Sequence, residues 1–281
     1  FPTRRSSDLI LREEDGHMLK VEKITKIFEP GTVSEKVALN QVDLVMNEGD
    51  FVTVIGGNGA GKSSLLNAIA GRFEVTSGSI FIDGTDLTRQ PEYKRAQWIG
   101  RVFQDPMMGT AANMTIEENL SIALRRGKIR TLNWGIGKGE KEVYINHLAQ
   151  LDLGLETRIK TKVGLLSGGQ RQALTLLMAT IKKPKLLLLD EHTAALDPST
   201  GRKVLSLTDK LVKENRLTTL MVTHNMKDAI QYGNRIIMMD EGRIIADIPL
   251  EKKKNIQVED LISLFEKTSR SGIANDRLLL A

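Results

Sequence analysis

A glycine-rich segment that ends in lysine and serine is the part of the chain whose residue types and spacing point most directly to chemistry. It reads Gly56-Gly57-Asn58-Gly59-Ala60-Gly61-Lys62-Ser63 and is followed by Ser64. Glycines let successive backbone N–H groups turn inward around a phosphate, and a helix that begins here points its positive end at the same place. We therefore expect Lys62 to reach the β- and γ-phosphates of a nucleotide, and the Ser63 hydroxyl to be a ligand of Mg²⁺.

The residues on both sides favour such a phosphate loop over the alternative, a glycine-rich turn that ends in Lys-Ser by chance. Residues 51–55 form an apolar, β-branched run typical of a buried strand, and residues 64–70 are helix formers. A strand, a loop and a helix in this order are the context in which the motif binds phosphate.

Four other polar side chains directly follow, or end, runs that predict buried strands. They are Gln104, Asp190, Glu191 and His224. Two adjacent carboxylates repel each other in a buried position unless a cation neutralises them, so the pair at 190 and 191 favours a nearby cation. In a largely parallel sheet the carboxyl ends of the strands meet at one edge, which is where ligands bind.

The composition is that of an ordinary globular chain and excludes several kinds of site. Of the 281 residues, 41% are hydrophobic and 27% are charged, and the net charge is +5. The chain has no cysteine, which excludes disulfides and thiolate sites and favours a reducing cytosol. No apolar run approaches the roughly 20 residues that span a bilayer. The basic residues form no dense block that would localise a nucleic-acid interface.

Strands and helices alternate along most of the chain, and one helical stretch interrupts the alternation. Short strands are predicted from residue 18 to 48, and further strand–helix units follow the phosphate loop. Within the helical stretch, Thr115 and Glu118 have the spacing of a capping box at the start of a helix. The pattern predicts an α/β fold with a largely parallel sheet and a helical insertion.

The segment Leu166-Ser167-Gly168-Gly169-Gln170, which we call the signature segment, lies between Gln104 and the carboxylate pair. With these motifs in this order, the chain resembles the ATP-binding subunit of a bacterial ABC transporter of the importer type, from residue 18 to about residue 265. The resemblance implies an α/β fold: a P-loop NTPase core with a largely parallel sheet, an N-terminal antiparallel β subdomain and an inserted α-helical subdomain.

On this basis three regions are expected. Residues 1–17 are expected to be a non-native or disordered extension, because residues 1–9 look like the in-frame translation of a sequencing-adapter oligonucleotide. Residues 18–257 are expected to form the ABC ATPase domain, with the helical subdomain at about 105–182. Residues 258–281 are interpreted as a C-terminal helix and a polar tail without an assigned role.

The resemblance also implies a role for each residue at a strand end. Asp190 would hold Mg²⁺, and Glu191 would polarise the attacking water. Gln104 resembles the loop glutamine that touches Mg²⁺ and this water, and His224 resembles the switch histidine that contacts the γ-phosphate. The expected catalytic residues are therefore Glu191, His224 and Gln104, and the expected metal ligands are Ser63, Gln104 and Asp190.

Further contacts to the nucleotide are expected from both ends of the site. Phe28 precedes a Pro-Gly turn and could stack on adenine, although a core or edge position is an equal alternative. In the family, two copies join head to tail, and the signature segment of one caps the γ-phosphate held by the other. The expected contacts are Gly56, Asn58, Gly59, Ala60, Gly61, Lys62, Ser63 and Ser64 of the loop, Ser167, Gly168, Gly169 and Gln170 of the signature segment, and Asp197.

Two features depart from the family pattern. Ala173 and Met178 stand where arginine is frequent, which makes the helix after the signature segment more apolar and puts ion pairs of those arginines in doubt. His192 stands behind Glu191 where proline is usual. It could reach toward the site, but a local packing variation is the preferred interpretation.

The function implied is hydrolysis of ATP, with Mg²⁺, to drive import of a small organic solute such as an amino acid through a separate permease. The expected partners are a second ATPase subunit, integral-membrane permease subunits and an extracytoplasmic solute-binding protein, but no nucleic acid. The expected location is peripheral, on the cytoplasmic face of the cell membrane.

Two alternatives remain at this point. A soluble ABC ATPase that acts on nucleic acid or ribosomes is the first, although such proteins usually carry paired cassettes or a coiled-coil insertion. A nucleotide kinase or GTPase is the second, and it would leave the signature segment unexplained. Met107, Met108 and Met114, near Gln104, could contact a permease or simply belong to the core.

Overall fold

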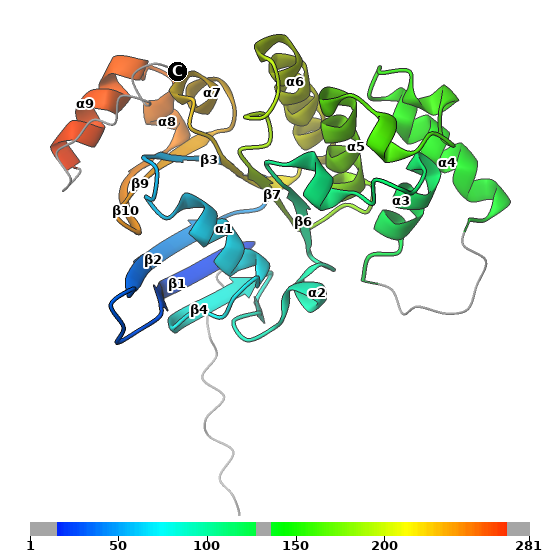
Figure 1. Cartoon of the computed structure of the whole chain (residues 1–281). Helices are drawn as coiled ribbons and strands as arrows, with labels where there is room; N and C mark the ends of the chain where they lie inside the picture. Colours follow the sequence, from blue (N-terminus) through cyan, green and yellow to red (C-terminus); the bar gives the residue numbers. More distant parts are fainter. Residues whose placement is uncertain (1–15, 128–135, 269–281) are drawn as a thin grey trace, which may run out of the picture.

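A six-stranded sheet crosses the middle of the molecule (Figure 1). The computed structural model describes residues 16–127 and 136–268. In order across the sheet, the strands are β10 (Arg243–Ile248), β9 (Arg235–Asp240), β3 (Phe51–Gly56), β8 (Thr218–Val222), β7 (Leu186–Asp190) and β6 (Ile99–Val102). Every neighbouring pair is parallel except β10 with β9, which confirms the predicted, largely parallel sheet.

A second, antiparallel sheet is built from the first part of the chain. Its strands, in order, are β2 (Lys36–Met46), β1 (Leu19–Phe28), β4 (Ser77–Ile82) and β5 (Thr85–Asp86). Apolar side chains alternate with polar ones along β1, and the apolar ones lie in the core. This sheet is the expected N-terminal antiparallel subdomain.

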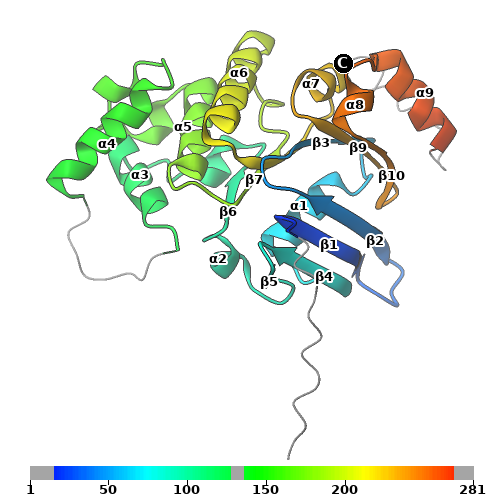
Figure 2. The ribbon, with the colours of Figure 1, turned by 180° about the vertical axis from the view of Figure 1, so that it is seen from behind.

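Helix α1 (Lys62–Ala70) lies between the two sheets (Figures 1 and 2). Its buried leucines and isoleucine pack with apolar side chains from both sheets. At its end, the buried Arg95 of α2 (Glu92–Arg95) donates from Nη1 to the carbonyl oxygens of Ala68 and Ile69, each at 2.8 Å. These bonds satisfy carbonyls that a helix end leaves unpaired, so Arg95 anchors the C-terminal end of α1.

Two long helices cover the opposite face of the six-stranded sheet. They are α5 (Gly168–Thr180) and α6 (Pro198–Asn215). Side chains of β7 point alternately to the two faces of the sheet. Those on one face pack on apolar residues of α5 and α6, and those on the other face lie in the cluster that contains α1. Because both faces of the sheet are covered, β7 is a continuous leucine run rather than an alternating one.

The helical insertion forms a lobe with its own hydrophobic core on one side of the molecule (Figures 1 and 2). It contains α3 (Ile116–Leu124), α4 (Lys138–Ala149) and α5, with short 3₁₀ turns at η1 (Pro106–Gly109), η2 (Leu155–Thr157) and η3 (Val163–Leu165). The predicted capping box is present: Thr115 Oγ1 accepts from the backbone N–H of Glu118, and the Glu118 carboxylate accepts from the backbone N–H of Thr115.

The last helices lie at the opposite end of the molecule from α4 (Figures 1 and 2). They are α7 (Met226–Gln231), α8 (Leu250–Lys253) and α9 (Val258–Thr268). The buried Leu261 and Phe265 of α9 pack into a cluster with β9, β10 and α7. The predicted amphipathic helix near the C-terminus is therefore part of the folded core.

Several details differ from the sequence predictions. Strand β10 and the short elements α2 and β5 were not predicted. The pattern of residues 141–153 predicts a second helix in the insertion, and the observed α4 begins three residues earlier. No helix among the described residues is long and apolar enough to cross a membrane. The predictions for residues 1–15, for residues 128–135 of a polar, glycine-bearing stretch at 127–139, and for the tail at 269–281 lie outside the described residues.

Candidate functional site

The loop between β3 and α1 has the backbone geometry expected of a phosphate cradle. Gly56 and Gly61 have φ angles of 154° and 99°, where a side chain is strained. A Cβ atom at Gly56 would lie 2.2 Å from the carbonyl oxygen of Met239, and one at Gly61 would lie 2.8 Å from that of Ala38. Only glycine fits these positions, and Lys62 then begins α1.

The side chain of Lys62 folds back over the loop. Its Nζ donates to the carbonyl oxygens of Gly56 at 2.8 Å and Gly57 at 3.0 Å, and the residue is almost fully buried. Burial lowers the pKa of Lys62, while the nearby Glu191 and Asp190 oppose this shift. A buried ammonium group held only by carbonyl oxygens is well placed to turn to phosphate oxygens.

Ser63 and Asp190 bring two oxygen donors together from distant parts of the chain. The Ser63 Oγ donates a hydrogen bond to Asp190 Oδ1 at 3.1 Å. Hydroxyl and carboxylate oxygens are the ligands that Mg²⁺ prefers, and Mg²⁺ commonly takes one or two protein ligands and completes its shell with phosphates and water. Among the described residues, no three His, Asp or Glu side chains gather into a metal cage. The donor set therefore fits Mg²⁺ bound together with a nucleotide.

Glu191 and His224 face each other beside this pair. His224 Nδ1 lies 3.7 Å from Glu191 Oε2, which is an ion-pair distance rather than a hydrogen-bond distance. The contact with His224 lowers the pKa of Glu191 against the effect of burial, and Lys62 adds to the lowering. The same contact raises the pKa of His224. Glu191 is thus a carboxylate at neutral pH, as a residue that polarises water must be.

Glu191 also has an unusual backbone. Its φ angle is 43°, in the left-handed region that residues other than glycine seldom adopt. Its backbone N–H donates to the carbonyl oxygen of Val222 at 3.1 Å, which holds the turn against β8. Strained backbone of this kind clusters at functional sites, where the surrounding structure supports it.

The parallel ladder places Gln104 at the same edge. Val102 pairs with Leu189 and Asp190 pairs with Val222, so the residues after β6, β7 and β8 emerge side by side. Gln104 is exposed and lies in the bend that follows β6. The buried Gln172 of α5 donates from Nε2 to the carbonyl oxygen of Phe103 at 3.1 Å. Helix α5 therefore holds the backbone next to Gln104.

His192 points away from the site. It is buried beside α6, and its Nε2 lies 3.0 Å from Thr208 Oγ1. Because the Thr208 hydroxyl already donates to the carbonyl oxygen of Val204, His192 must donate this bond from Nε2. Burial lowers its pKa to about 4. The packing interpretation of this residue is the one that the structure supports.

Arg101 and Asn67 extend the site and were not identified from the sequence. Arg101 Nη2 lies 2.6 Å from Asn67 Oδ1 and 3.4 Å from Asp190 Oδ2, and its guanidinium lies 4.5 Å from the ring centre of Phe103. Burial lowers the pKa of Arg101, and Asp190 opposes the shift. The sequence did offer a signal: Arg101 is a lone charge within an apolar strand, and such a charge is rarely buried without a partner.

The signature segment lies on the surface at the start of α5, and no hydrogen bond or ion pair between described residues joins it to Lys62. Ser167 Oγ accepts from the backbone N–H of Gln170, whose side chain accepts from the backbone N–H of Ser167. A side chain at Gly169 would clash with Thr200, and one at Gly168 would crowd Leu196. Within one chain the segment is therefore a surface helix start that no hydrogen bond or ion pair between described residues joins to the phosphate loop.

Asp197 and Phe28 have local partners, and no hydrogen bond or ion pair between described residues joins either of them to Lys62. Asp197 caps α6, because its Oδ1 accepts from the backbone N–H groups of Ser199 and Thr200. Hydrogen bonds from Thr200, first of all, hold the pKa of this carboxyl well below its usual range. Phe28 ends β1 and packs edge to face on Phe73 with ring centres 5.3 Å apart. Stacking of Phe28 on adenine stays a prediction.

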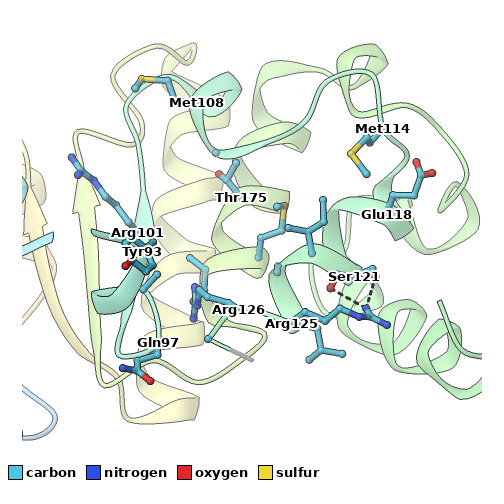
Figure 3. A pocket seen from close by; sticks show the side chains of 18 of the residues that line it. Tyr93, Gln97, Arg101, Met108, Met114, Glu118, Ser121, Arg125, Arg126 and Thr175 are labelled. Atoms are coloured by element: carbon cyan, nitrogen blue, oxygen red, sulfur yellow. Dashed lines mark hydrogen bonds between the residues drawn. The ribbon is translucent and has the colours of Figure 1, made fainter. Parts of the chain in front are cut away.

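An open groove of about 1650 Å³ lies next to this edge, between the core and the helical lobe (Figure 3). Its wall comes from α2, β6, η1, α3, α4 and α5. Three large apolar side chains in it are largely exposed: Tyr93 at 74%, Met108 at 54% and Ile122 at 51%. Exposed apolar side chains that gather around a hollow are typical of a surface that binds another protein.

Comparisons with known proteins agree with this geometry. The sequence model of a family described as "ABC transporter" matches residues 39–194. A tyrosine transport ATP-binding protein of Clostridioides difficile is 46% identical over 255 residues, which are 89% of this chain and 99% of that protein. A thiamine import ATP-binding protein of Yersinia pseudotuberculosis is 35% identical over 83% of this chain and 91% of its own length.

Solved structures show the same fold. An ATP-binding cassette determined as a dimer in a post-hydrolysis state, with ADP and phosphate bound, superposes with a TM-score of 0.71. It is 30% identical, and the match covers 83% of this chain and 99% of that cassette.

Proposed function

The chain belongs to the ABC transporter family as an ATP-binding, ATP-hydrolysing subunit, and from this premise we propose that it powers the import of a small amino-acid-like solute through a separate permease. The observation that carries the solute class is the 46% identity to a tyrosine transport subunit across 99% of that protein's length. Relatives at about one-third identity are described as import subunits for thiamine and methionine. The proposed class is therefore an aromatic or other amino acid.

For hydrolysis, the loop and the strand ends have separate tasks. Lys62 and the N–H groups of the loop between β3 and α1 would bind the β- and γ-phosphates. Glu191 would accept a hydrogen bond, and then a proton, from the water that attacks the γ-phosphorus. The bond from that phosphorus to the bridging oxygen of ADP breaks, which yields ADP and phosphate. His224, next to Glu191, would donate to the γ-phosphate and hold the carboxylate in place.

Ser63 and Asp190 are the proposed protein ligands of Mg²⁺, and Gln104 lies at the same edge. When bound, Mg²⁺ would neutralise charge on the phosphate oxygens. The 3.1 Å hydrogen bond between Ser63 and Asp190 already places both oxygens together.

The site is completed, in this proposal, by a second copy. The Ser167 hydroxyl accepts a bond within its own capping box, but its hydrogen has no acceptor among the described residues. Exposed N–H groups at the start of α5 add to the attraction for an anion. Because no hydrogen bond or ion pair between described residues joins this helix start to Lys62, we assign its phosphate to the partner subunit in a head-to-tail dimer. The dimeric cassette with ADP and phosphate supports this arrangement.

The groove is the proposed contact with the permease. Its exposed Tyr93, Met108 and Ile122 would pack against an amphipathic helix of the membrane subunit, and methionine adapts to such a surface. Docking there would hold the chain on the cytoplasmic face of the membrane. An extracytoplasmic protein that delivers the solute is a further proposed partner.

Reconstitution tests the transport function. The chain is combined in vesicles with the permease encoded beside it, and ATP-dependent uptake of labelled tyrosine and of other amino acids is measured. Ile122→Asp should weaken association and uptake, whereas Val33→Asp, at an exposed residue that does not line the groove, should change neither. Hydrolysis stimulated by DNA or ribosomes, without any uptake by the reconstituted permease, would contradict the proposal.

A further inference from the structure

The geometry points to Arg101 as a positioning residue that competes with the metal ion for Asp190 and so links metal binding to the wall of the docking groove. This inference rests on the proposed function of Asp190 as a ligand of Mg²⁺. It concerns a residue whose side chain contacts the site on one side and lines the groove on the other.

The guanidinium of Arg101 holds two parts of the site together. Nη2 donates to Asn67 on α1 at 2.6 Å and approaches Asp190 on β7 at 3.4 Å. The side chains of Arg101 and Asp190 are only 9% and 13% exposed, so water screens their attraction weakly. The carboxylate Oδ1 is bound by Ser63 and Oδ2 faces Arg101, which leaves both oxygens engaged.

A metal ion at Asp190 would place a second cation next to this guanidinium. Two neighbouring cations repel each other in a poorly solvated site. The ion must therefore bind against the repulsion from Arg101 or displace its guanidinium. Displacement is possible because the guanidinium still has unused hydrogen-bond donors. Its Nε and Nη1 are buried and have no hydrogen-bond partner among the described residues. Arg101 is therefore only partly satisfied in its present position.

Movement of Arg101 would change the shape of the groove wall. Its side chain is part of the groove wall, with the guanidinium directed away from Arg125 and Arg126 (Figure 3). The guanidinium also contacts the ring of Phe103, another lining residue, which directly precedes Gln104. A change in the partner of Asp190 thus alters two neighbouring side chains on which a docked partner would rest.

Binding of Mn²⁺, a spectroscopic substitute for Mg²⁺, tests this directly. Free Mn²⁺ is measured by electron paramagnetic resonance in the presence of the ADP complex of the full chain. Arg101→Met should bind Mn²⁺ about three- to tenfold more tightly than the parent chain, because a nearby cation is removed. Arg101→Lys, which keeps the charge, should stay close to the parent. Lys94→Met removes a charge from the same groove without contacting Asp190, and should also leave Mn²⁺ affinity unchanged.

Hydrogen–deuterium exchange supplies a second readout that does not depend on activity. In the parent chain, adding Mg²⁺ to the ADP complex should change exchange across residues 99–109, and this change should be lost in Arg101→Met. Should Arg101→Met fail to fold, Arg101→Gln replaces it as the neutral variant. Equal Mn²⁺ affinity in the parent and in the folded neutral variant would overturn the inference, and so would an unchanged exchange response. Failure of the parent chain to bind any Mn²⁺ with ADP would instead overturn the assigned function of Asp190.

Discussion

Ser63 and Asp190 are 127 positions apart in the chain, yet the Ser63 hydroxyl donates a hydrogen bond to the Asp190 carboxylate over 3.1 Å. The bond joins the first turn of α1 to the end of β7, and so connects the phosphate loop to the proposed metal carboxylate. Two oxygen donors from separate motifs are thereby adjacent in the folded chain.

This relationship predicts the effect of Asp190→Asn. A neutral amide at this position cannot balance a divalent cation, so Mg²⁺ should no longer promote ATP binding, and hydrolysis should fall by about a hundredfold or more. Titration of a fluorescent ATP analogue, with and without Mg²⁺, measures the change. Asp209→Asn, at a half-buried position of α6 where the carboxylate pairs with Lys213, serves as the control. Normal Mg²⁺ dependence in Asp190→Asn would show that the metal is held elsewhere.

Lys62→Ala should remove most nucleotide binding. The Nζ of Lys62 is buried and bonded only to loop carbonyls, so its loss deprives the phosphates of their one buried cation in the loop. We expect ATP affinity to fall by about tenfold or more and hydrolysis to fall below detection. Isothermal titration with ATP checks the affinity, and Lys183→Ala, an exposed lysine, is the matched control. Parent-like affinity in Lys62→Ala would contradict the role of the loop.

A mixture of two inactive variants tests the head-to-tail arrangement. A Lys62→Ala chain keeps its signature segment, and a Ser167→Arg chain keeps its phosphate loop. Mixed dimers should therefore contain one intact site, and the hydrolysis rate of the mixture should exceed the sum of the two separate variants. No recovery over a range of mixing ratios would mean that both segments act within one chain.

His192 predicts a pH dependence of stability. Its pKa is about 4 in the folded chain against an ordinary 6.5, so the unfolded chain takes up a proton first as the pH falls. The folded state should therefore lose about 2 kcal/mol between about pH 7 and pH 5 from this residue. In His192→Gln, whose Nε2 can still donate to Thr208, that part of the loss should vanish. Urea unfolding at both pH values measures it, and equal losses in both proteins would refute the assignment.

The sequence predicted the elements of the site better than it predicted their arrangement. The loop at Gly56, the strand end at Asp190 and the capping box of α3 depend on local spacing, and all appear where the pattern places them. The strand order is different. Strand β3 lies between β8 and β9, and both of these strands are distant from β3 in sequence. Local patterns carry no information about such pairing.

The features that escaped prediction arise from tertiary contacts. From the sequence alone, Arg101 is a charged residue in a short strand with no visible partner. In the folded chain, Asn67 and Asp190 lie next to it. The left-handed backbone of Glu191 likewise depends on its bond to β8 and has no sequence signature. Strand β10 was missed because its apolar run is short and interrupted by Asp247, and its pairing with β9 is what makes it a strand.

The central claim is that ATP is hydrolysed between two copies of this chain, with Glu191 polarising the water. Size-exclusion chromatography with light scattering of Glu191→Gln, alongside a phosphate-release assay, tests it most directly. We predict a stable dimer with ATP, a monomer with ADP, and hydrolysis reduced by about a hundredfold or more. A Glu191→Gln chain that stays monomeric in ATP and still releases phosphate at the parent rate would contradict the account.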